Sequence, residues 1–249
     1  MRRRVGPYEV LRVLGAGGMG VVEEARHVET GARYALKRLR PEAAADPELR
    51  ARFLREAQAL ASLRHPNVVP VHAARLDGPE PYLVQPLFAG SLADRLREGP
   101  LAVEEACRLV GELAAGLAHA HERGVLHRDL KVENVLLADD GRPLLADFGL
   151  AVLGEEEQRL TLTGELLGTP ATMAPEQARD SKSVDERADV YGLGVILFTL
   201  LAGEPPFRSR GEGALALLSR LQHEPAPDLR RRRADVPAPL AALVAAALA

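Results

Sequence analysis

The stretch that decides the fold is HRDLKVEN at residues 127–134, which is followed by DFG at residues 147–149. Charged and polar side chains are interleaved there with apolar ones, and the apolar side chains would anchor the segment to a core. This apolar set consists of Leu130, Val135, Leu136 and Leu137. A hairpin with scattered charges would show a similar alternation, so the interpretation depends on what the polar side chains can do together.

Phosphoryl-transfer chemistry accounts for the polar side chains of this stretch. The reaction needs a group that orients the attacking hydroxyl, a cation near the transferring oxygens, metal ligands and a phosphate clamp. Asp129 can accept the hydroxyl hydrogen, and Lys131 can neutralise the γ-phosphate. Asn134 and Asp147 supply hard oxygen ligands that suit Mg²⁺. The combination predicts a phosphotransfer site.

A glycine cluster upstream, GAGGMGVV at residues 15–22, is a candidate phosphate-binding loop. Glycine lets backbone N–H groups approach phosphate oxygens because no Cβ intervenes. A flexible hairpin turn or a dinucleotide site could share this spacing. A dinucleotide site requires the loop to open a helix, whereas a strand-like run follows here.

Lys37 lies in the apolar run YALK at residues 34–37, which we expect to form a strand. A lysine in such a strand is often a surface residue on the alternate face. If Lys37 faces a cleft, a phosphate would be its ligand and Glu56, on the following helical segment, its carboxylate partner. As an isolated pair the two residues could equally form an ordinary surface salt bridge.

The hydrophobic pattern divides the chain into two parts, which predicts an α+β fold with two lobes. Residues 1–85 would form a β-rich nucleotide-binding lobe around one helix. Residues 86–249 would form a mainly helical catalytic lobe, with a ligand cleft between the two. We expect strands over residues 8–14, 21–27, 32–39, 68–71 and 82–85, and helices over residues 47–63, 103–123, 189–201, 215–221 and 240–249.

Composition excludes several other classes of protein. The formal net charge of −3 argues against a dedicated nucleic-acid binder, because phosphate neutralisation needs a basic surface. The late apolar stretch at residues 240–249 falls short of the roughly 20 residues that a membrane span needs. The single cysteine, Cys107, is compatible with a reducing compartment, and its apolar neighbours predict a core position. We therefore expect a soluble, cytoplasmic chain.

Together the motifs resemble the protein kinase family, and most closely the eukaryotic-like serine/threonine kinases of bacteria. LGAGGMG at residues 14–20, and GTP followed by MAPEQA within residues 168–178, are typical of those kinases. The resemblance runs from Tyr8 to about Ala249. It implies a two-lobed protein-kinase-like fold and transfer of the γ-phosphate of ATP to serine or threonine hydroxyls of proteins. Mg²⁺ is the implied metal, with Mn²⁺ as an alternative.

The resemblance also implies a role for each matching residue. Lys37 would hold the α- and β-phosphates and pair with Glu56, while Asp129 would be the catalytic base. Lys131 would meet the transferring phosphate, and Asn134 and Asp147 would bind the metal. Asp189 would brace the catalytic loop through its backbone. The nucleotide site would comprise Leu14, Gly15, Gly17, Gly20, Val22, Ala35, Lys37, Gln85, Phe88 and Leu136, with Gln85 as gatekeeper and Phe88 in the hinge.

Regulation is implied by the segment that follows the DFG motif. In the family, an arginine at the position of Arg128 can pair with a phosphate on the activation segment and order that segment. Thr161 and Thr163 are our candidate phosphosites, and the alternative is two solvated loop threonines. Thr169, with Lys131, is the serine/threonine signature. Self-phosphorylation and a homodimer through the small lobe are further expectations from the family.

Two other functions remain open at this point. A pseudokinase or nucleotide-binding scaffold would keep the fold without catalysis. A small-molecule phosphotransferase of related fold is disfavoured by Arg128, Lys131 and the segment at residues 169–176. The resemblance also implies that the chain stops before the family's final helix, so that Glu176 would lack its usual arginine partner and be costly to bury.

Overall fold

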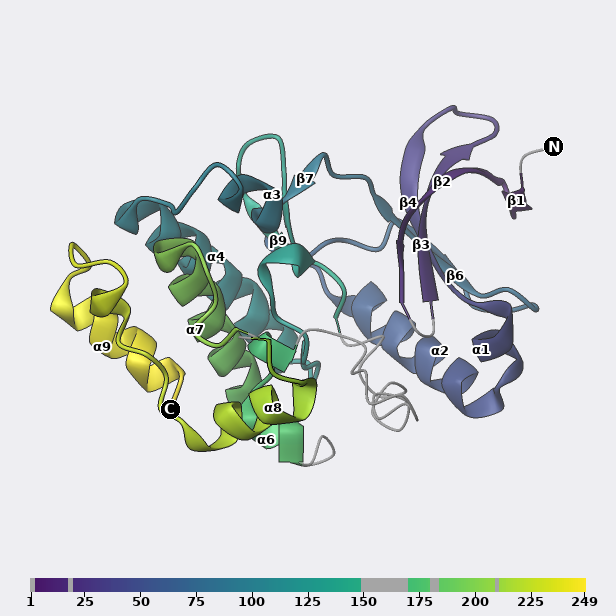
Figure 1. The fold of residues 1–249 in the computed structure, drawn as a ribbon. Coiled ribbons are helices and arrows are strands. Elements are labelled where there is room, and N and C mark those ends of the chain that lie inside the picture. The colour runs from purple at the N-terminus through teal and green to yellow at the C-terminus, as the bar shows by residue number, and fades with distance from the viewer. Residues whose placement is uncertain (1–2, 18–19, 149–169, 180–183, 209–210) are drawn as a thin grey trace.

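The computed structural model describes residues 3–17, 20–148, 170–179, 184–208 and 211–249. Figure 1 shows an antiparallel sheet lobe on one side of the molecule and a helical lobe on the other. The chain passes from the first lobe to the second after the strand that ends at Pro86. This arrangement is the α+β, two-lobed fold that the sequence predicts.

The small lobe is built on a six-stranded sheet with the order β1-β2-β3-β4-β6-β5. Successive strand residues point to opposite faces, and the register pairs Val22 with Lys37 and Glu23 with Leu36. Val22, Ala35 and Lys37 therefore share one face of the sheet, and Glu23 and Leu36 share the other. The strands are β1 (Arg4–Val5), β2 (Tyr8–Ala16), β3 (Gly20–His27), β4 (Arg33–Leu39), β5 (Ala73–Arg75) and β6 (Tyr82–Pro86).

The prediction of a strand over residues 68–71 is wrong. The fifth strand is Ala73–Arg75, and Val68 forms only an isolated parallel bridge with Leu145. Val68 and Val69 are buried because they pack against the helical lobe. The backbone N–H of Val69 donates to the carbonyl of Leu145 at 2.9 Å. The apolar run is real, but its hydrogen-bonding partner lies outside the six-stranded sheet.

Helix α2 (Pro47–Ser62), preceded by the short α1 (Pro41–Ala45), accompanies the sheet. Asp46 caps α2 because its carboxylate accepts from the N–H groups of Glu48 and Leu49. Proline at the first helical position is favourable there, since its φ angle is already helical. Phe53, Ala57 and Leu60 form the buried stripe of the helix. The predicted helix is therefore confirmed, and it carries Glu56.

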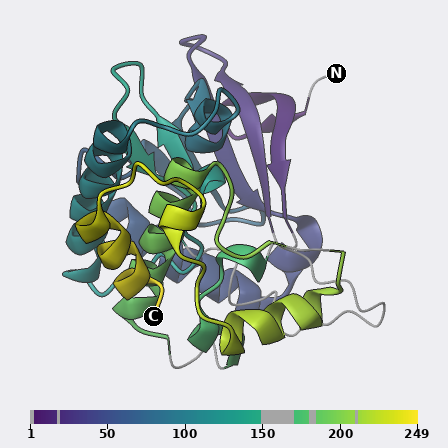
Figure 2. The ribbon, with the colours of Figure 1, turned by 60° about the vertical axis from the view of Figure 1, so that its left-hand side comes forward.

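The helical lobe is organised around α7 (Glu186–Ala202), whose residues are buried on almost every side, as its apolar sequence predicts. Figure 2 shows α9 beside α7, and a Cβ added to Gly194 of α7 would lie 2.9 Å from the Cβ of Ala247. Helix α7 begins earlier than expected because Asp185 caps it through the N–H of Arg187. The helices are α3 (Leu92–Leu96), α4 (Val103–His121), α6 (Pro175–Arg179), α7 (Glu186–Ala202), α8 (Ala214–His223) and α9 (Ala238–Ala247).

A second, three-stranded sheet carries the chemistry-bearing segment. Its order is β7-β8-β9, and all pairs are antiparallel. A single turn of 3₁₀ helix, η1 (Val132–Asn134), leads directly into β8. The strands are β7 (Gly90–Ser91), β8 (Val135–Leu137) and β9 (Pro143–Leu145), and two further 3₁₀ turns are η2 (Pro170–Thr172) and η4 (Leu229–Arg231).

The prediction that Cys107 is a core residue is wrong, because its side chain is exposed. On α4 the buried positions near it are Ala106, Leu109 and Leu113, and Cys107 lies outside that stripe. Among the described residues, no helix is both long enough and apolar enough to cross a membrane.

Candidate active site

The side chain of Asp189, on α7, forms hydrogen bonds to the backbone of the loop that carries Asp129. The side chain of Asp189 is buried and accepts the backbone N–H of His127 at 2.8 Å and that of Arg128 at 2.7 Å. His121 of α4 lies 2.8 Å from the same carboxylate. Arg128 has a φ of 63°, a conformation that costs energy for a non-glycine residue. These bonds hold that strained residue in place and confirm the predicted bracing role of Asp189.

His127 joins this loop to the segment that carries Asp147. Its ring is fully buried, with Nε2 2.9 Å from the carbonyl oxygen of Ala146. Its Nδ1 accepts the backbone N–H of Asp129 at 3.3 Å. A carbonyl can only accept, so Nε2 carries the proton and the imidazole is neutral. Burial lowers the pKa of His127, which keeps the ring in this form.

Asp129 lies at the centre of a small polar network. Lys131 Nζ is 2.8 Å from Asp129 Oδ2, and Asn134 Nδ2 donates to the same oxygen at 2.8 Å. The same Nδ2 also donates to the backbone carbonyl of Asp129 at 2.8 Å. Asp129 Oδ1 has no bond to any residue that the structure describes, so this oxygen is free to accept a hydrogen from a hydroxyl. The predicted catalytic pair of Asp129 and Lys131 is thus brought together.

Lys37 and Asp147 meet across the space between the lobes. Lys37 Nζ lies 2.8 Å from Asp147 Oδ1. The Lys37 ammonium holds the pKa of Asp147 below its usual range, so the carboxylate is charged at neutral pH. Asp147 has a φ of 57°, which again marks a backbone that the surroundings hold in place. Sequence reasoning gave Lys37 a different carboxylate, Glu56, whose backbone lies on α2 and whose side chain is outside the described residues.

The oxygen atoms that the predicted metal site requires are present. Asn134 uses its amide nitrogen on Asp129, so its Oδ1 can serve as a metal ligand, and Asp147 has a second oxygen, Oδ2, besides the one that contacts Lys37. The N–H of Ala146, next to Asp147, donates to the carbonyl of Asn134 at 2.9 Å and ties the two segments together. Carboxylate and amide oxygens fit Mg²⁺, which commonly retains waters and substrate phosphate oxygens as its other ligands.

Several residues predicted to hold the nucleotide lie on the same sheet as Lys37. Val22, Ala35 and Lys37 share the sheet face described above, and Gln85 of β6 pairs with Ala35 in the register. Gly17 N–H donates to the carbonyl of Gly20 at 2.9 Å, which closes the glycine turn. Leu14 and Gly15 lie near the end of β2, before that turn, and Leu14 is 40% exposed.

A separate apolar cluster contains two more of the predicted nucleotide-binding residues. Phe88 and Leu136 are partly buried and pack against the buried Val69, Leu144 and Ala146. The sequence prediction omitted these last three. Ala146 could have been found, because it directly precedes the DFG motif. Val69 could not, because it was assigned to a strand of the other sheet.

Gln177 is another residue that the sequence reasoning missed. Its Nε2 donates to the carbonyl of Arg128 at 2.8 Å, and its Oε1 accepts the N–H of Ala174 at 3.1 Å. It therefore connects the catalytic loop to α6, which follows the segment proposed for regulation. Its place inside the quoted MAPEQA motif was the available signal.

Several predicted features remain untested by the geometry. Thr161, Thr163 and Thr169 lie outside the described residues. Glu176 lies on α6, and its negative charge adds to burial in raising the pKa of Tyr191 on α7. The expectation that Glu176 lacks an arginine partner stays a prediction.

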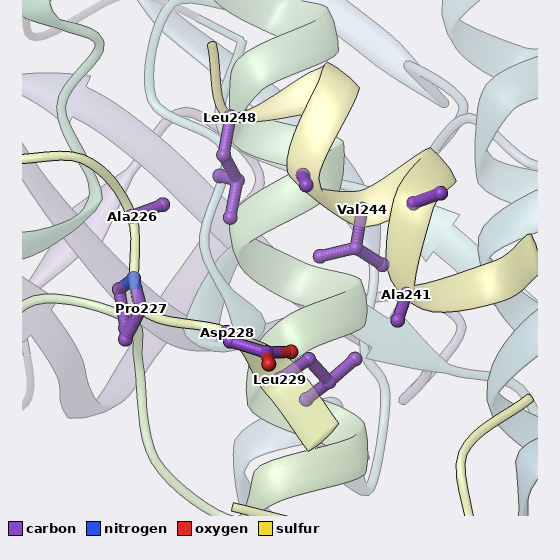
Figure 3. A pocket seen from close by; sticks show the side chains of 9 residues that line it. Ala226, Pro227, Asp228, Leu229, Ala241, Val244 and Leu248 are labelled. Atoms are coloured by element: carbon purple, nitrogen blue, oxygen red, sulfur yellow. The ribbon is translucent and has the colours of Figure 1, made fainter. Parts of the chain in front are cut away.

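The hollow that the structure shows at α9 has a different character from the Asp129 site. It has a volume of about 290 Å³ and lies between α9 and the segment before η4 (Figure 3). Its charged lining residue, Asp228, accepts the N–H of Arg230 and so caps η4. The other side chains that line it are apolar, including Ala226, Pro227, Leu229, Ala241, Val244 and Leu248. It offers no set of polar groups for chemistry.

Comparisons with known proteins agree with this geometry. A family model described as the protein kinase domain matches residues 8–237. The serine/threonine-protein kinase PknJ of Mycobacterium tuberculosis is 41% identical over 248 residues, covering 97% of this chain and 42% of PknJ. The DNA damage-responsive serine/threonine-protein kinase RqkA of Deinococcus radiodurans is 40% identical over 242 residues, covering 93% of this chain and 35% of RqkA.

Among solved structures, the kinase domain of Mycobacterium tuberculosis PknI matches with a TM-score of 0.73 and 33% identity, covering 99% of this chain and 90% of that domain. This match confirms the predicted fold class. The chain spans about two-fifths of the length of the curated relatives that it matches, with 42% of PknJ covered.

Proposed function

This chain belongs to the protein kinase domain family, and on that basis we propose that it transfers the γ-phosphate of ATP to serine and threonine hydroxyls of proteins. The observation that carries the proposal is the network around Asp129, in which Lys131 and Asn134 fix one carboxylate oxygen and no described residue bonds the other. Membership of the family implies ATP and a divalent metal ion. We propose Mg²⁺ as that metal, with Mn²⁺ as an alternative.

In the proposed reaction Asp129 Oδ1 accepts the hydrogen of the acceptor hydroxyl. The hydroxyl oxygen forms a bond to the γ-phosphorus while the bond from that phosphorus to the β,γ-bridging oxygen breaks, and ADP leaves. Asn134 and Lys131 hold Asp129 in one orientation, so the base needs no rearrangement when the hydroxyl arrives. The ammonium of Lys131 lies beside the base, where it can balance charge on the transferring oxygens.

Lys37 and Asp147 would bind the nucleotide and the metal in this reaction. Their direct contact lies where phosphates and metal would enter, so ATP binding would exchange it for contacts to the ligand. Lys37 would then hold the α- and β-phosphates with Glu56 as its partner, and Asp147 and Asn134 would offer oxygens to the metal. A bound metal would neutralise charge on the phosphate oxygens.

The test is a phosphotransfer assay with labelled ATP and Mg²⁺, using the chain itself and a generic basic protein as acceptors. We expect Asp129→Asn to lower the rate by about 10²- to 10⁴-fold, the usual contribution of a general base. Asp139→Asn is the matched control, because Asp139 is an exposed carboxylate in the turn between β8 and β9. Wild-type transfer that does not exceed the Asp129→Asn background would contradict the proposal and favour the pseudokinase alternative, provided that ATP still binds.

We extend the proposal to regulation by phosphorylation of Thr161 or Thr163, with self-phosphorylation as the source. Its support is Arg128, whose Nε is buried without a hydrogen-bond partner among the described residues. A phosphate on the neighbouring segment could satisfy this guanidinium. If Thr161→Ala/Thr163→Ala retains the full activity of the phosphorylated wild type, the regulatory role is wrong.

The lobes of the proposed enzyme would divide at about residue 85, with residues 1–85 holding the nucleotide and residues 86–249 the acceptor. We also propose a cytoplasmic location, because ATP is available there. A homodimer through the small lobe stays a prediction.

A further inference from the structure

The segment that follows α2 is fastened to the helical lobe. The N–H of Leu145 in β9 donates to the carbonyl of Asn67 at 2.9 Å, and Asn67 Nδ2 donates to the carbonyl of Pro143 at 2.9 Å. Gly116 of α4 allows this close approach, because an added Cβ would lie 2.9 Å from the carbonyl oxygen of Asn67. The C-terminal end of α2, at Ser62, is therefore held within a few residues of a contact with the other lobe.

Two histidine rings complete this attachment. His65 Nδ1 accepts the backbone N–H of Asn67 at 3.1 Å, and His119 Nε2 of α4 accepts the backbone N–H of Arg64 at 3.3 Å. The ring centroids lie 5.2 Å apart. A ring nitrogen accepts a hydrogen bond only when it carries no proton, so both bonds require neutral imidazoles. The geometry thus specifies the protonation state of both rings.

We propose that His65 and His119 are proton-sensitive positioning residues, which in their neutral form hold the end of α2 on the helical lobe and on protonation release it. A proton on either accepting nitrogen turns it into a donor that faces a backbone N–H. Two imidazolium rings at this separation would also repel each other. The effect on catalysis rests on the proposed phosphotransfer, because α2 carries Glu56, whereas the attachment itself does not.

The surrounding charges do not compensate a protonated pair. Glu112 of α4 is the nearby acid, and it accepts from Arg108 at 2.7 Å and from Asn67 Nδ2 at 3.3 Å. Other charged groups near the pair are Arg64, Arg123, whose guanidinium bonds the backbone carbonyl of His119 and pairs with Glu122, and Arg142, which bonds the carbonyl of Pro66 and pairs with Asp140. The arginines add positive charge, and the acids already have partners.

The direction of the pH effect follows from the fold's preference for neutral rings. Burial, and then the facing His119, lower the pKa of His65. Its contribution to stability is therefore complete above the ordinary histidine pKa of about 6.5. That contribution is lost as the pH falls through the lowered value in the folded state.

Amide hydrogen exchange at Arg64 and Asn67 tests the proposal directly, after correction for the intrinsic rate at each pH. Between about pH 7.5 and about pH 5.5 we expect wild-type protection at these two amides to fall about fivefold, as the loss of one hydrogen bond implies. In His119→Gln the side-chain amide oxygen can still accept but cannot be protonated, so protection of the Arg64 amide should stay constant. His65→Asn should do the same for the amide of Asn67.

The matched control is His223→Gln, because His223 is exposed at the end of α8 and lies on a different element from the pair. It should follow the wild type. Equal pH dependence in His119→Gln and wild type would overturn the proposal, as would constant protection in the wild type. If the variants do not fold, imidazole titration of the wild type by NMR decides. A His65 that titrates at or above about 6.5 overturns the proposal.

An activity measurement then separates this proposal from the proposed function. The kcat of the wild type should fall more between the two pH values than that of His119→Gln. If the chain shows no phosphotransfer activity, the proposed function is wrong, but the hydrogen-exchange result still supports the proton-sensitive attachment. Lost exchange protection with an unchanged ratio of kcat values would remove the link to catalysis and overturn the positioning role.

Discussion

Lys37 and Arg38 are neighbours on β4, and their ion pairs differ in almost every respect. They point to opposite faces of the sheet, as consecutive strand residues do. Lys37 meets Asp147 through one contact of 2.8 Å, and the two side chains are 13% and 44% exposed. Arg38 meets Glu23 through two contacts of 2.7 and 2.9 Å, and both side chains are 6% exposed. One pair is open to a ligand, and the other is closed.

The difference suggests a division of work on one strand, with one ion pair for stability and the other for the proposed catalysis. The guanidinium of Arg38 matches both oxygens of Glu23 and also donates to the carbonyl of Leu39. These bonds offset the large cost of removing two charges from water. Lys37 has a compact ammonium and an exposed partner, so a phosphate can replace that partner at little cost. The proposed function therefore uses the pair that is easier to break.

The largest effect is expected from breaking the closed pair. Glu23→Met would leave Arg38 buried without its carboxylate, which should lower the free energy of unfolding by about 3–5 kcal/mol. This corresponds to a fall in Tm of roughly 6–20 °C for a domain of this size. Thermal unfolding measures it. The KM for ATP of the folded fraction should stay close to that of the wild type.

The double variant Glu23→Met/Arg38→Met is the control for that experiment. It removes both charges and fills the space with apolar side chains, so it should recover much of the lost stability. If the double variant is less stable than Glu23→Met, the buried unpaired charge of Arg38 is not the main cause of the lost stability. Other contacts of the Arg38 side chain would then contribute more to the free energy of unfolding.

The next largest effect concerns the open pair, and it should appear in activity. Lys37→Met should lower the rate of phosphotransfer by about 10²- to 10³-fold, as loss of a preorganised charge at the reacting phosphates does. Its stability should change by no more than about 1 kcal/mol, because the pair is partly exposed. Arg38→Lys is a useful contrast, since it should mainly change stability. If the Lys37→Met variant keeps its activity, Lys37 is not part of the active site.

Sequence reasoning found the open pair's lysine but not its observed partner. Lys37, Asp129, Asn134 and Asp147 belong to motifs whose spacing reflects chemistry, so local sequence was sufficient to select them as candidates. Which carboxylate Lys37 meets depends on how two lobes approach each other. No local pattern contains that information, and the sequence therefore pointed to Glu56 alone.

The closed pair was not predicted at all. Glu23 and Arg38 are charged residues in strands, and by composition such residues belong on the surface. They lie on the sheet face of Ala25 and Leu36, which pack with Val5 and Tyr8, and packing of this kind is a tertiary feature. The error at residues 68–71 has a similar origin, because the apolar run correctly indicated burial but not the hydrogen-bonding partner. The error at Cys107 is different, because its apolar neighbours indicated burial and the side chain is exposed.

The smallest effect is a change in acid titration at the open pair. Lys37 lowers the pKa of Asp147 by its charge and then, beyond the opposing effect of burial, by its hydrogen bond. The contribution of this pair to stability is therefore present above the ordinary aspartate pKa of about 3.9 and is lost as the pH falls through the lowered value. Lys37→Met should move the Asp147 titration upward, as followed by NMR at its side-chain carboxyl carbon. Arg38→Met, one residue away on the opposite face, should leave it unchanged, and coincident curves for Lys37→Met and wild type would mean that another group sets the charge of Asp147.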